Sequence, residues 1–277
     1  MQYALIADIH GNREALEAVL QAIDREYPGA AILCPGDIVG YGPDPASCVD
    51  LLRERGVPCV RGNHEEMVVG LRDFSRCVAA GIHAATWTRR QLSEGQLRFL
   101  RELPIRRPVD ASLWMCHGDL LNADTYVSDA ASAGRALEQL GELAPAARVL
   151  VCGHTHHAAV YTHGTAFRVQ PAAGSVPLDP ARRHVVNPGA VGQSRDGEPM
   201  ARFAVLDLDR HALHFHRLAY DHATTESKMR RAGLRGGVVL LPPRGVWRRV
   251  ERARTRWARF WGERDNRQRG YRAEFGS

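Results

Sequence analysis

Five short clusters of His, Asp and Asn punctuate this chain, and each one directly follows an apolar run. The clearest is Cys152-Gly-His-Thr-His-His157, which comes after the run at 148–151. Alternate residues of an extended segment point to the same side, so His154 and His156 can face one point in space while His157 points away. The other four clusters are Asp8-Ile-His10-Gly-Asn12, Gly36-Asp37, Gly62-Asn63-His64-Glu65 and Cys116-His117-Gly118-Asp119.

The first 65 residues alternate short apolar runs with amphipathic segments. We expect strands over 3–7, 30–34 and 57–60, and helices after Asn12 and over 45–55. This β-α-β-α-β order implies parallel strands joined by right-handed crossovers. Ligands of open parallel sheets bind beyond the carboxyl ends of the strands. The first three polar clusters therefore fall at one edge of the expected sheet.

The rest of the body has a different pattern. Residues 66–103 are predicted to form two or three helices, a helical insertion that lies over or beside the site. Strands are expected at 109–116 and 148–151, with a helix over 128–140 between them. A parallel half followed by an antiparallel half predicts an α/β fold in which two sheets form a β-sandwich flanked by helices. The close spacing that indicates hairpins of an antiparallel sheet is found among the strands expected at 159–162, 166–169, 184–187, 201–207 and 212–218.

Charge separates the end of the chain from its body. Residues 228–277 contain 15 Lys and Arg but only 4 Asp and Glu, whereas the remainder is mildly acidic. We therefore expect a domain over 1–220 and a basic helical C-terminal extension over 221–277. Within the extension, apolar residues recur at roughly helical spacing between arginines. These are Trp247, Val250, Trp257 and Trp261.

Three roles stay open for this Trp/Arg segment. Its apolar face can pack on the body, with the arginines in solvent. An amphipathic helix with Trp on one face and Arg on the other also suits an anionic membrane surface. Nucleic acid phosphates are a third partner, which the charge alone would attract.

Several observations bear on the compartment. No apolar run approaches the ~20 residues that span a bilayer, and the first cluster begins too close to Met1 to leave room for a signal peptide. The six Cys show no paired C-x-x-C spacing, and most lie in or beside apolar runs. We therefore expect a cytoplasmic protein with no transmembrane segment and with reduced, buried thiols.

The side chains at the expected strand ends form a mixed set of imidazole, carboxylate and amide ligands, which suits cations such as Mn, Fe, Zn, Ni or Co. Seven ligands are too many for one catalytic ion with an open position, but they suit two ions that share a carboxylate. Two ions ~4 Å apart can clamp an in-line phosphoryl displacement and acidify a bridging water. The seven candidates are Asp8, His10, Asp37, Asn63, His117, His154 and His156.

In their order along the chain, these motifs resemble those of the calcineurin-like metallophosphoesterases. The family pattern is D-x-H, G-D, G-N-H-[DE], G-H or H-G, and G-H-x-H, and residues 3 to about 208 carry it. The segments Asp37-Ile-Val-Gly-Tyr-Gly42 and Asn187-Pro-Gly-Ala-Val-Gly192 look like the small bacterial and archaeal predicted-phosphodiesterase branch. The resemblance implies a four-layer αββα sandwich, in agreement with the fold expected from the residues.

The resemblance also implies a role for each motif residue. Asp37 would bridge the two metal ions. His64 would lie near the leaving oxygen as a general acid or as a stabiliser of transition-state charge. The remaining ligands would divide between the ions, with Asp8, His10 and His156 on the first and Asn63, His117 and His154 on the second.

One departure from related families matters for the substrate. Protein Ser/Thr phosphatases and symmetric dinucleoside-tetraphosphate hydrolases carry a phosphate-binding Arg shortly after the Gly-Asp motif, and this chain has Gly40-Tyr41-Gly42 there. The position at which the phosphatases carry the Asp that supports their catalytic His is also occupied by another residue in this chain, Gly40. Phosphate binding could fall instead to Asn12, Arg61 or Arg195. Asn12 can alternatively cap a helix, and both arginines can be solvated loop cations.

The sequence thus predicts a dinuclear metal-dependent phosphoesterase. It would hydrolyse phosphodiesters or small phosphomonoesters by in-line attack of a metal-bridging hydroxide. Two alternative activities stay open, a nuclease that holds nucleic acid with its basic tail and a dinucleoside polyphosphate hydrolase. A non-enzymatic scaffold of the same fold is disfavoured, because such proteins lose ligands and this chain keeps all seven together with His64.

Overall fold

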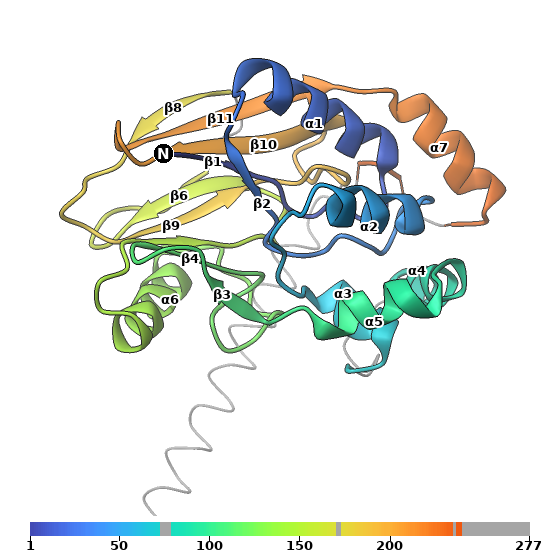
Figure 1. Cartoon of the computed structure of the whole chain (residues 1–277), viewed down its shortest axis with the longest axis horizontal. Coiled ribbons are helices and arrows are strands. Elements are labelled where there is room, and N and C mark those ends of the chain that lie inside the picture. Colours follow the sequence, from blue (N-terminus) through green and yellow to red (C-terminus); the bar gives the residue numbers. More distant parts are fainter. Residues whose placement is uncertain (73–78, 170–172, 235–236, 240–277) are drawn as a thin grey trace, which may run out of the picture. The chain divides into compact units, whose positions relative to one another are not determined.

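Figure 1 shows the structure of the chain, a computed structural model that describes residues 1–72, 79–169, 173–234 and 237–239. Residues Met1–Leu240 form one compact unit, so the boundary expected at residue 220 falls inside this unit. In the described part of the chain, no helix combines the length and the apolar character that a membrane crossing requires. The Trp/Arg segment lies outside the described residues, and its three possible roles stay predictions.

The first sheet has the strand order β2-β1-β10-β11-β8. Within it, β1 (Gln2–Leu5) pairs in parallel with β2 (Ala31–Leu33) and antiparallel with the central strand β10 (Met200–Asp207). The hairpin partner of β10 is β11 (Ala212–Ala219), and β8 (Gly174–Pro177) adds a further antiparallel strand. Strands from both ends of the chain therefore build one mixed sheet.

The prediction of a strand at 57–60 was wrong. This segment makes only a single parallel bridge, between Cys34 and Cys59. Pro58 has no N–H to donate to a strand ladder, which confines the segment to a sheet edge. Its carbonyl still accepts from Cys34 N at 3.0 Å, and Val60 N donates to Cys34 O at 3.1 Å. The chain thus still delivers the following Gly-Asn-His-Glu motif to the end of the sheet where β2 stops.

The second sheet is also mixed. Its strand order is β3-β4-β5-β9-β6-β7, in which β4, β5 and β9 are parallel and the flanking strands are antiparallel. The expectation of one parallel half and one antiparallel half was therefore wrong, because late strands pair with early ones in both sheets. The strands are β3 (Arg106–Pro108), β4 (Leu113–Cys116), β5 (Val149–Val151), β6 (Ala158–Thr162), β7 (Arg168–Val169) and β9 (His184–Pro188).

Strand alternation sorts the apolar side chains into layers. In β1, Tyr3 and Leu5 join the core between the two sheets, whereas Ala4 packs on the opposite face of the first sheet. That outer face is covered by α1 (Arg13–Glu26) and α2 (Pro45–Glu54), whose buried residues share the same core. The outer face of the second sheet is covered by α6 (Ala130–Leu143). The predicted four-layer αββα sandwich is confirmed.

The other helices lie at the end of the sandwich where β1 and β2 finish (Figure 1). Within the region expected to be a helical insertion, the chain forms α3 (Asn63–Val69), α4 (Ala79–Gln91) and α5 (Glu94–Glu102). Near the end of the compact unit, Asp221 caps α7 (His222–Arg231) by accepting a hydrogen bond from Thr224 N. This helix packs beside α1.

Candidate metal centre

The turns after four strands and the N-terminus of α3 meet at one end of the sandwich. The turns after β1, β2, β4 and β5 carry Asp and His side chains, and α3 begins with Asn63. All seven of these side chains are buried, so their polar atoms are withdrawn from bulk water. They are Asp8, His10, Asp37, Asn63, His117, His154 and His156, the seven that follow the expected strands in the sequence.

The first cluster consists of Asp8, His10, Asp37 and His156, with one ligand atom from each lying within 4.8 Å of all the others. The Nε2 atoms of His10 and His156 are 3.0 Å apart. A carboxylate oxygen of Asp8 lies 3.6 Å from His156 Nε2, and one of Asp37 lies 3.7 Å from His10 Nε2. Two imidazole nitrogens and two carboxylates thus converge on one point.

The second cluster consists of Asp37, His117 and His154, again with ligand atoms within 4.8 Å of one another. His117 Nε2 lies 3.1 Å from Asp37 Oδ2 and 3.1 Å from Asn63 Oδ1. The amide of Asn63 therefore adds an oxygen ligand to this group. Asp37 belongs to both clusters, which is the geometry of a carboxylate shared by two ions.

Backbone conformation separates these ligands from ordinary strand residues. Five of them have φ between +50° and +67°, a left-handed region that costs of order 1–3 kcal/mol for a residue with a Cβ. The extended geometry expected for Cys152–His157 was wrong, because β5 ends at Val151 and both histidines lie in a tight turn. The five left-handed ligands are Asp8, His10, Asp37, His154 and His156.

Backbone carbonyls orient three of the imidazoles. Each of these rings uses Nδ1 to hydrogen-bond a carbonyl oxygen, so Nδ1 carries a proton and Nε2 is directed into a cluster. The bonds join His10 to Val39 O at 3.2 Å, His117 to Pro35 O at 2.8 Å and His156 to Gln193 O at 2.7 Å.

Two orphaned atoms indicate that the clusters fit metal ions. Asp8 Oδ2 and His154 Nε2 are buried and have no hydrogen-bond partner among the described residues. The nearest ion-pair partner of His154 Nε2, Asp124 Oδ1, is 3.8 Å away. A buried polar atom without a partner is costly unless something else satisfies it. The neutral imidazoles, carboxylates and amide oxygen gathered here are the donors that a borderline divalent cation takes.

Electrostatics favour the neutral, ligating form of three of the four histidines. Burial lowers the pKa of His10, His154 and His156 well below the ordinary value, so these imidazoles are neutral. Burial raises the pKa of Asp8 to about 7. Burial also opposes the charges of Asp37 and His117. Their mutual attraction nevertheless holds the pKa of Asp37 well below its usual range and raises the pKa of His117 to about 10.

His64 lies beside the first cluster. Its ring centroid is 4.7 Å from that of His10 and 4.5 Å from that of Tyr41, and its backbone N donates to Asp37 Oδ1 at 3.0 Å. A Cβ at residue 40 would collide with the His64 ring, and Gly40 has φ +93°. The position where phosphatases carry a supporting Asp must therefore be Gly in this chain.

The three expected phosphate-binding residues have different surroundings. The Asn12 side chain caps α1 by accepting from Ala15 N, and it also donates to Gly192 O at 2.8 Å, so its hydrogen bonds are committed. Arg61 donates to the carbonyls of Arg101 and Leu103, which ties the end of α5 to the sheet. Only Arg195 lies against a cluster.

Arg195 directs its guanidinium towards the second cluster. Its Nη1 donates to His154 O at 3.4 Å, and its Nε is buried without a hydrogen-bond partner among the described residues. Its positive charge helps to lower the pKa of His10, His154 and His156, although burial lowers each pKa more. A guanidinium in this position can receive a phosphate oxygen.

Several residues next to the clusters had no role predicted from the sequence. Glu65 is fully buried, and its carboxylate accepts from the backbone N–H groups of Asp37, Val39 and Gly62 at 2.9, 3.1 and 2.8 Å. Tyr126 packs on His154 with ring centroids 4.0 Å apart. Glu65 stands inside the Gly-Asn-His-Glu motif, so its position was a usable signal. Tyr126 lies in a loop without any motif.

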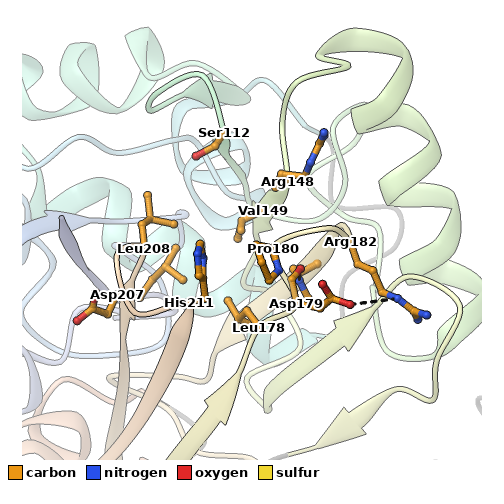
Figure 2. A pocket seen from close by; sticks show the side chains of 12 residues that line it. Ser112, Arg148, Val149, Leu178, Asp179, Pro180, Arg182, Asp207, Leu208 and His211 are labelled. Atoms are coloured by element: carbon orange, nitrogen blue, oxygen red, sulfur yellow. Dashed lines mark hydrogen bonds and ion pairs between the residues drawn. The ribbon is translucent and has the colours of Figure 1, made fainter.

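A cavity of about 150 Å³ lies at the amino ends of the parallel strands, away from the clusters (Figure 2). It is bordered by Ser112, Val149 and His211, and the Arg182 and Asp179 side chains pair at its rim, 3.4 Å apart. None of the predicted site residues lines it. The two clusters of residues that could hold metal ions are therefore the candidate site.

An αββα sandwich with two metal-type clusters at its strand ends has the architecture of a metal-dependent phosphoesterase. The chain belongs to the calcineurin-like phosphoesterase superfamily, whose domain model matches residues 1–211. The family predicted from the five motifs is thereby confirmed.

Relatives come from archaea and bacteria. An uncharacterized protein of Methanocaldococcus jannaschii, MJ0912, is 30% identical over 233 residues, which cover 79% of this chain and 87% of that protein. The crystal structure of a metallophosphoesterase from Sphaerobacter thermophilus superposes with a TM-score of 0.69 at 33% identity, covering 85% of this chain and 95% of that one. The hypothetical protein PH1004 from Pyrococcus horikoshii shares the fold, with a TM-score of 0.68 at 19% identity over 86% of this chain and 95% of that one.

Proposed function

We propose that this protein is a dinuclear metal-dependent phosphoesterase that hydrolyses phosphodiesters or small phosphomonoesters. The observation that carries the proposal is the position of Asp37, which is shared by two clusters of buried ligands. Membership of a phosphoesterase family supports the reaction class. One shared carboxylate places two ions close enough to act on a single phosphate group.

The proposal divides the ligands as the two clusters do. Bound divalent ions would neutralise phosphate charge and acidify a water molecule at neutral pH. Burial keeps His10, His154 and His156 neutral, and carbonyl hydrogen bonds aim His10, His117 and His156 before any ion arrives. Asp8, His10 and His156 would hold one ion, Asn63, His117 and His154 would hold the other, and Asp37 would be shared.

His64 and Arg195 would act on the substrate directly. The His64 ring lies next to His10, so it can reach an oxygen of a phosphate held by the ions and serve as a general acid or charge stabiliser. Arg195 would receive a non-bridging oxygen from the side of His154. In this proposal Asn12 and Arg61 organise the backbone and do not bind phosphate.

The test uses the purified full-length chain, stripped with a chelator and reloaded with Mn²⁺, Co²⁺ or Ni²⁺. We expect two bound ions per chain and hydrolysis of bis-p-nitrophenyl phosphate or p-nitrophenyl phosphate. Asp37→Asn should lower the rate by roughly 100-fold or more, because losing even an outer-shell partner costs 10–100-fold. A wild-type chain that binds two ions but cleaves neither ester would overturn the proposed activity. Failure to bind two ions would overturn the dinuclear centre.

A further inference from the structure

The carbonyl of Gln193 sets the direction of one metal ligand. It accepts a hydrogen bond from His156 Nδ1 at 2.7 Å, and this bond turns Nε2 of the same ring towards Asp8 and His10. Such a partner fixes the orientation of a ligating imidazole and raises its basicity. Whatever holds the Gln193 carbonyl in place therefore also holds His156.

A segment near the end of the compact unit fixes the position of that carbonyl by hydrogen bonds to the opposite side of the same peptide group. The C=O of Gln193 and the N–H of Ser194 belong to one planar peptide group and point in opposite directions. The Ser194 N–H donates to Val238 O at 2.8 Å, and the Gln193 side chain donates to Gly237 O at 3.4 Å. A continuous series of hydrogen bonds thus runs from Val238 through the 193–194 peptide to His156.

A second anchor fixes the preceding residue. The Gly192 carbonyl accepts from Asn12 Nδ2 at 2.8 Å, and the same amide donates to Tyr220 Oη at 3.0 Å. The hydroxyl of Thr225, which is fully buried, lies within hydrogen-bond distance of Asn12 Oδ1 at 3.1 Å and of Glu14 Oε2 at 2.8 Å. Asn12 follows the ligand His10 by two residues. The turns that carry both histidines of the first cluster are therefore tied to Tyr220, Thr225 and residues 237–238.

This segment has its own attachment to the body. Met229, Leu234 and Val238 form an apolar cluster with Ala84 of α4. Lys228 pairs with Glu14 and Asp44, which lie at the starts of α1 and α2. The second metal-type cluster is oriented differently, since His117 Nδ1 bonds to Pro35 O.

We infer that residues 220–234 and 237–239, here called the C-terminal strap, position His10 and His156 and thereby determine how tightly the first ion is held. Val238 and Thr225 act as positioning residues through the 192–194 backbone. The inference rests on the proposed dinuclear function. It extends the functional unit past residue 211, where the family match ends.

Calorimetric titration of the chelator-stripped full-length chain with Co²⁺ tests the strap. Val238→Asp places a charge in an apolar cluster, which should release the segment from Ser194. We expect one of the two binding events to weaken about 10–100-fold while the other stays unchanged. Single variants His156→Ala and His117→Ala identify which event belongs to which cluster. In the His156→Ala background, Val238→Asp should have no further effect on Co²⁺ binding.

A pair of isosteric changes avoids any general loss of folding. Tyr220→Phe combined with Thr225→Val removes the two hydroxyls that hold Asn12 and should weaken the same event. Thr224→Val is the matched control, because its hydroxyl bonds to Asp221 within the same helix. It should leave both events unchanged. Amide hydrogen exchange of the metal-free chain should show reduced protection of the Ser194 N–H in Val238→Asp.

Two results would overturn the inference that the C-terminal strap positions His10 and His156. One is equal weakening of both events, and the other is wild-type Co²⁺ binding by a folded variant whose Ser194 amide has lost protection. If Val238→Asp does not fold, the Tyr220→Phe, Thr225→Val pair decides by the same criteria. A wild-type chain that lacks two binding events refutes the dinuclear proposal itself, before any variant is compared.

Discussion

At the scale of single residues, the clusters are built from backbone positions that most side chains avoid. Left-handed turns place Asp8, His10 and Asp37 so that their side chains reach inwards immediately after a strand. The strain of these turns is offset by the buried hydrogen bonds around them. Gly40 shows the same principle in reverse, since its missing side chain makes room for the His64 ring.

Gly40→Ala should therefore damage catalysis without emptying the metal centre. The new methyl group would displace the His64 imidazole, and losing a general acid costs about 10²–10⁴-fold in rate. We expect kcat to fall at least about 100-fold while metal content, measured by mass spectrometry, stays at the wild-type value. Gly56→Ala is the control, because Gly56 also has positive φ but a methyl group added there would meet no atom within 4 Å. Equal effects of the two variants would assign the loss to backbone strain.

Arg195→Gln should weaken substrate binding more than metal binding. A hydrogen bond to a charged group contributes about 1.5–3 kcal/mol, which corresponds to an increase in KM of roughly 10–100-fold. Steady-state kinetics with a phosphodiester would measure this. Arg210→Gln serves as the control, since the Arg210 side chain is 78% exposed and lies in the turn between β10 and β11, where it pairs with Asp207. An unchanged KM in Arg195→Gln would remove Arg195 from the phosphate site.

At the scale of elements, the start of α3 connects the two halves of the site. Its Glu65 carboxylate binds the turn after β2 and the residue that precedes α3, so Asp37 and Asn63 are held by one side chain. The helix therefore serves as a bracket between two ligand-bearing segments.

Glu65→Gln should destabilise this bracket. An amide keeps only one oxygen to accept hydrogen bonds, so at least one buried N–H loses its partner at a cost of about 1–3 kcal/mol. Urea unfolding in the presence of a chelator would report this as a lower free energy of unfolding. Glu94→Gln, an exposed change in the first turn of α5, should alter the same quantity by less than about 0.5 kcal/mol. Equal decreases in the free energy of unfolding of the two variants would contradict this role of Glu65.

Short motifs could be interpreted from the sequence because each depends on local chemistry. An apolar run followed by Asp-Ile-His or Gly-Asp identifies a strand end, and α1 was expected from its apolar stripe and its Asn12 cap. The strand order could not be read in this way. Nothing in the sequence near β1 or β10 indicates that these two strands pair. The expected strand at 57–60 does not form because Pro58 lacks the N–H that a ladder needs, and only one bridge remains. The left-handed turns and the strap also depend on contacts between distant residues.

At the scale of the whole molecule, the clusters concentrate buried charge at one end of an otherwise apolar sandwich. Each ion bound there would stabilise the folded state by about 2.7 kcal/mol when the metal is present at 100 times its Kd. For a domain of this size that corresponds to an increase in Tm of roughly 5–10 °C. Calorimetric melting with and without Mn²⁺ measures the shift. Asp37→Asn should abolish most of it, and a full shift in that variant would place the ions elsewhere.

The pairing of β1 with β10 also has a consequence for synthesis of the protein. Gln2 and Asp207 are partners in this ladder although they are 205 residues apart along the chain. During translation the Asp8 and His10 motif emerges first, but its strand gains its antiparallel neighbour only when nearly the whole domain has been made. The first ligands to leave the ribosome therefore follow a strand that is completed late, and a chain that stops before β10 would leave β1 without this neighbour.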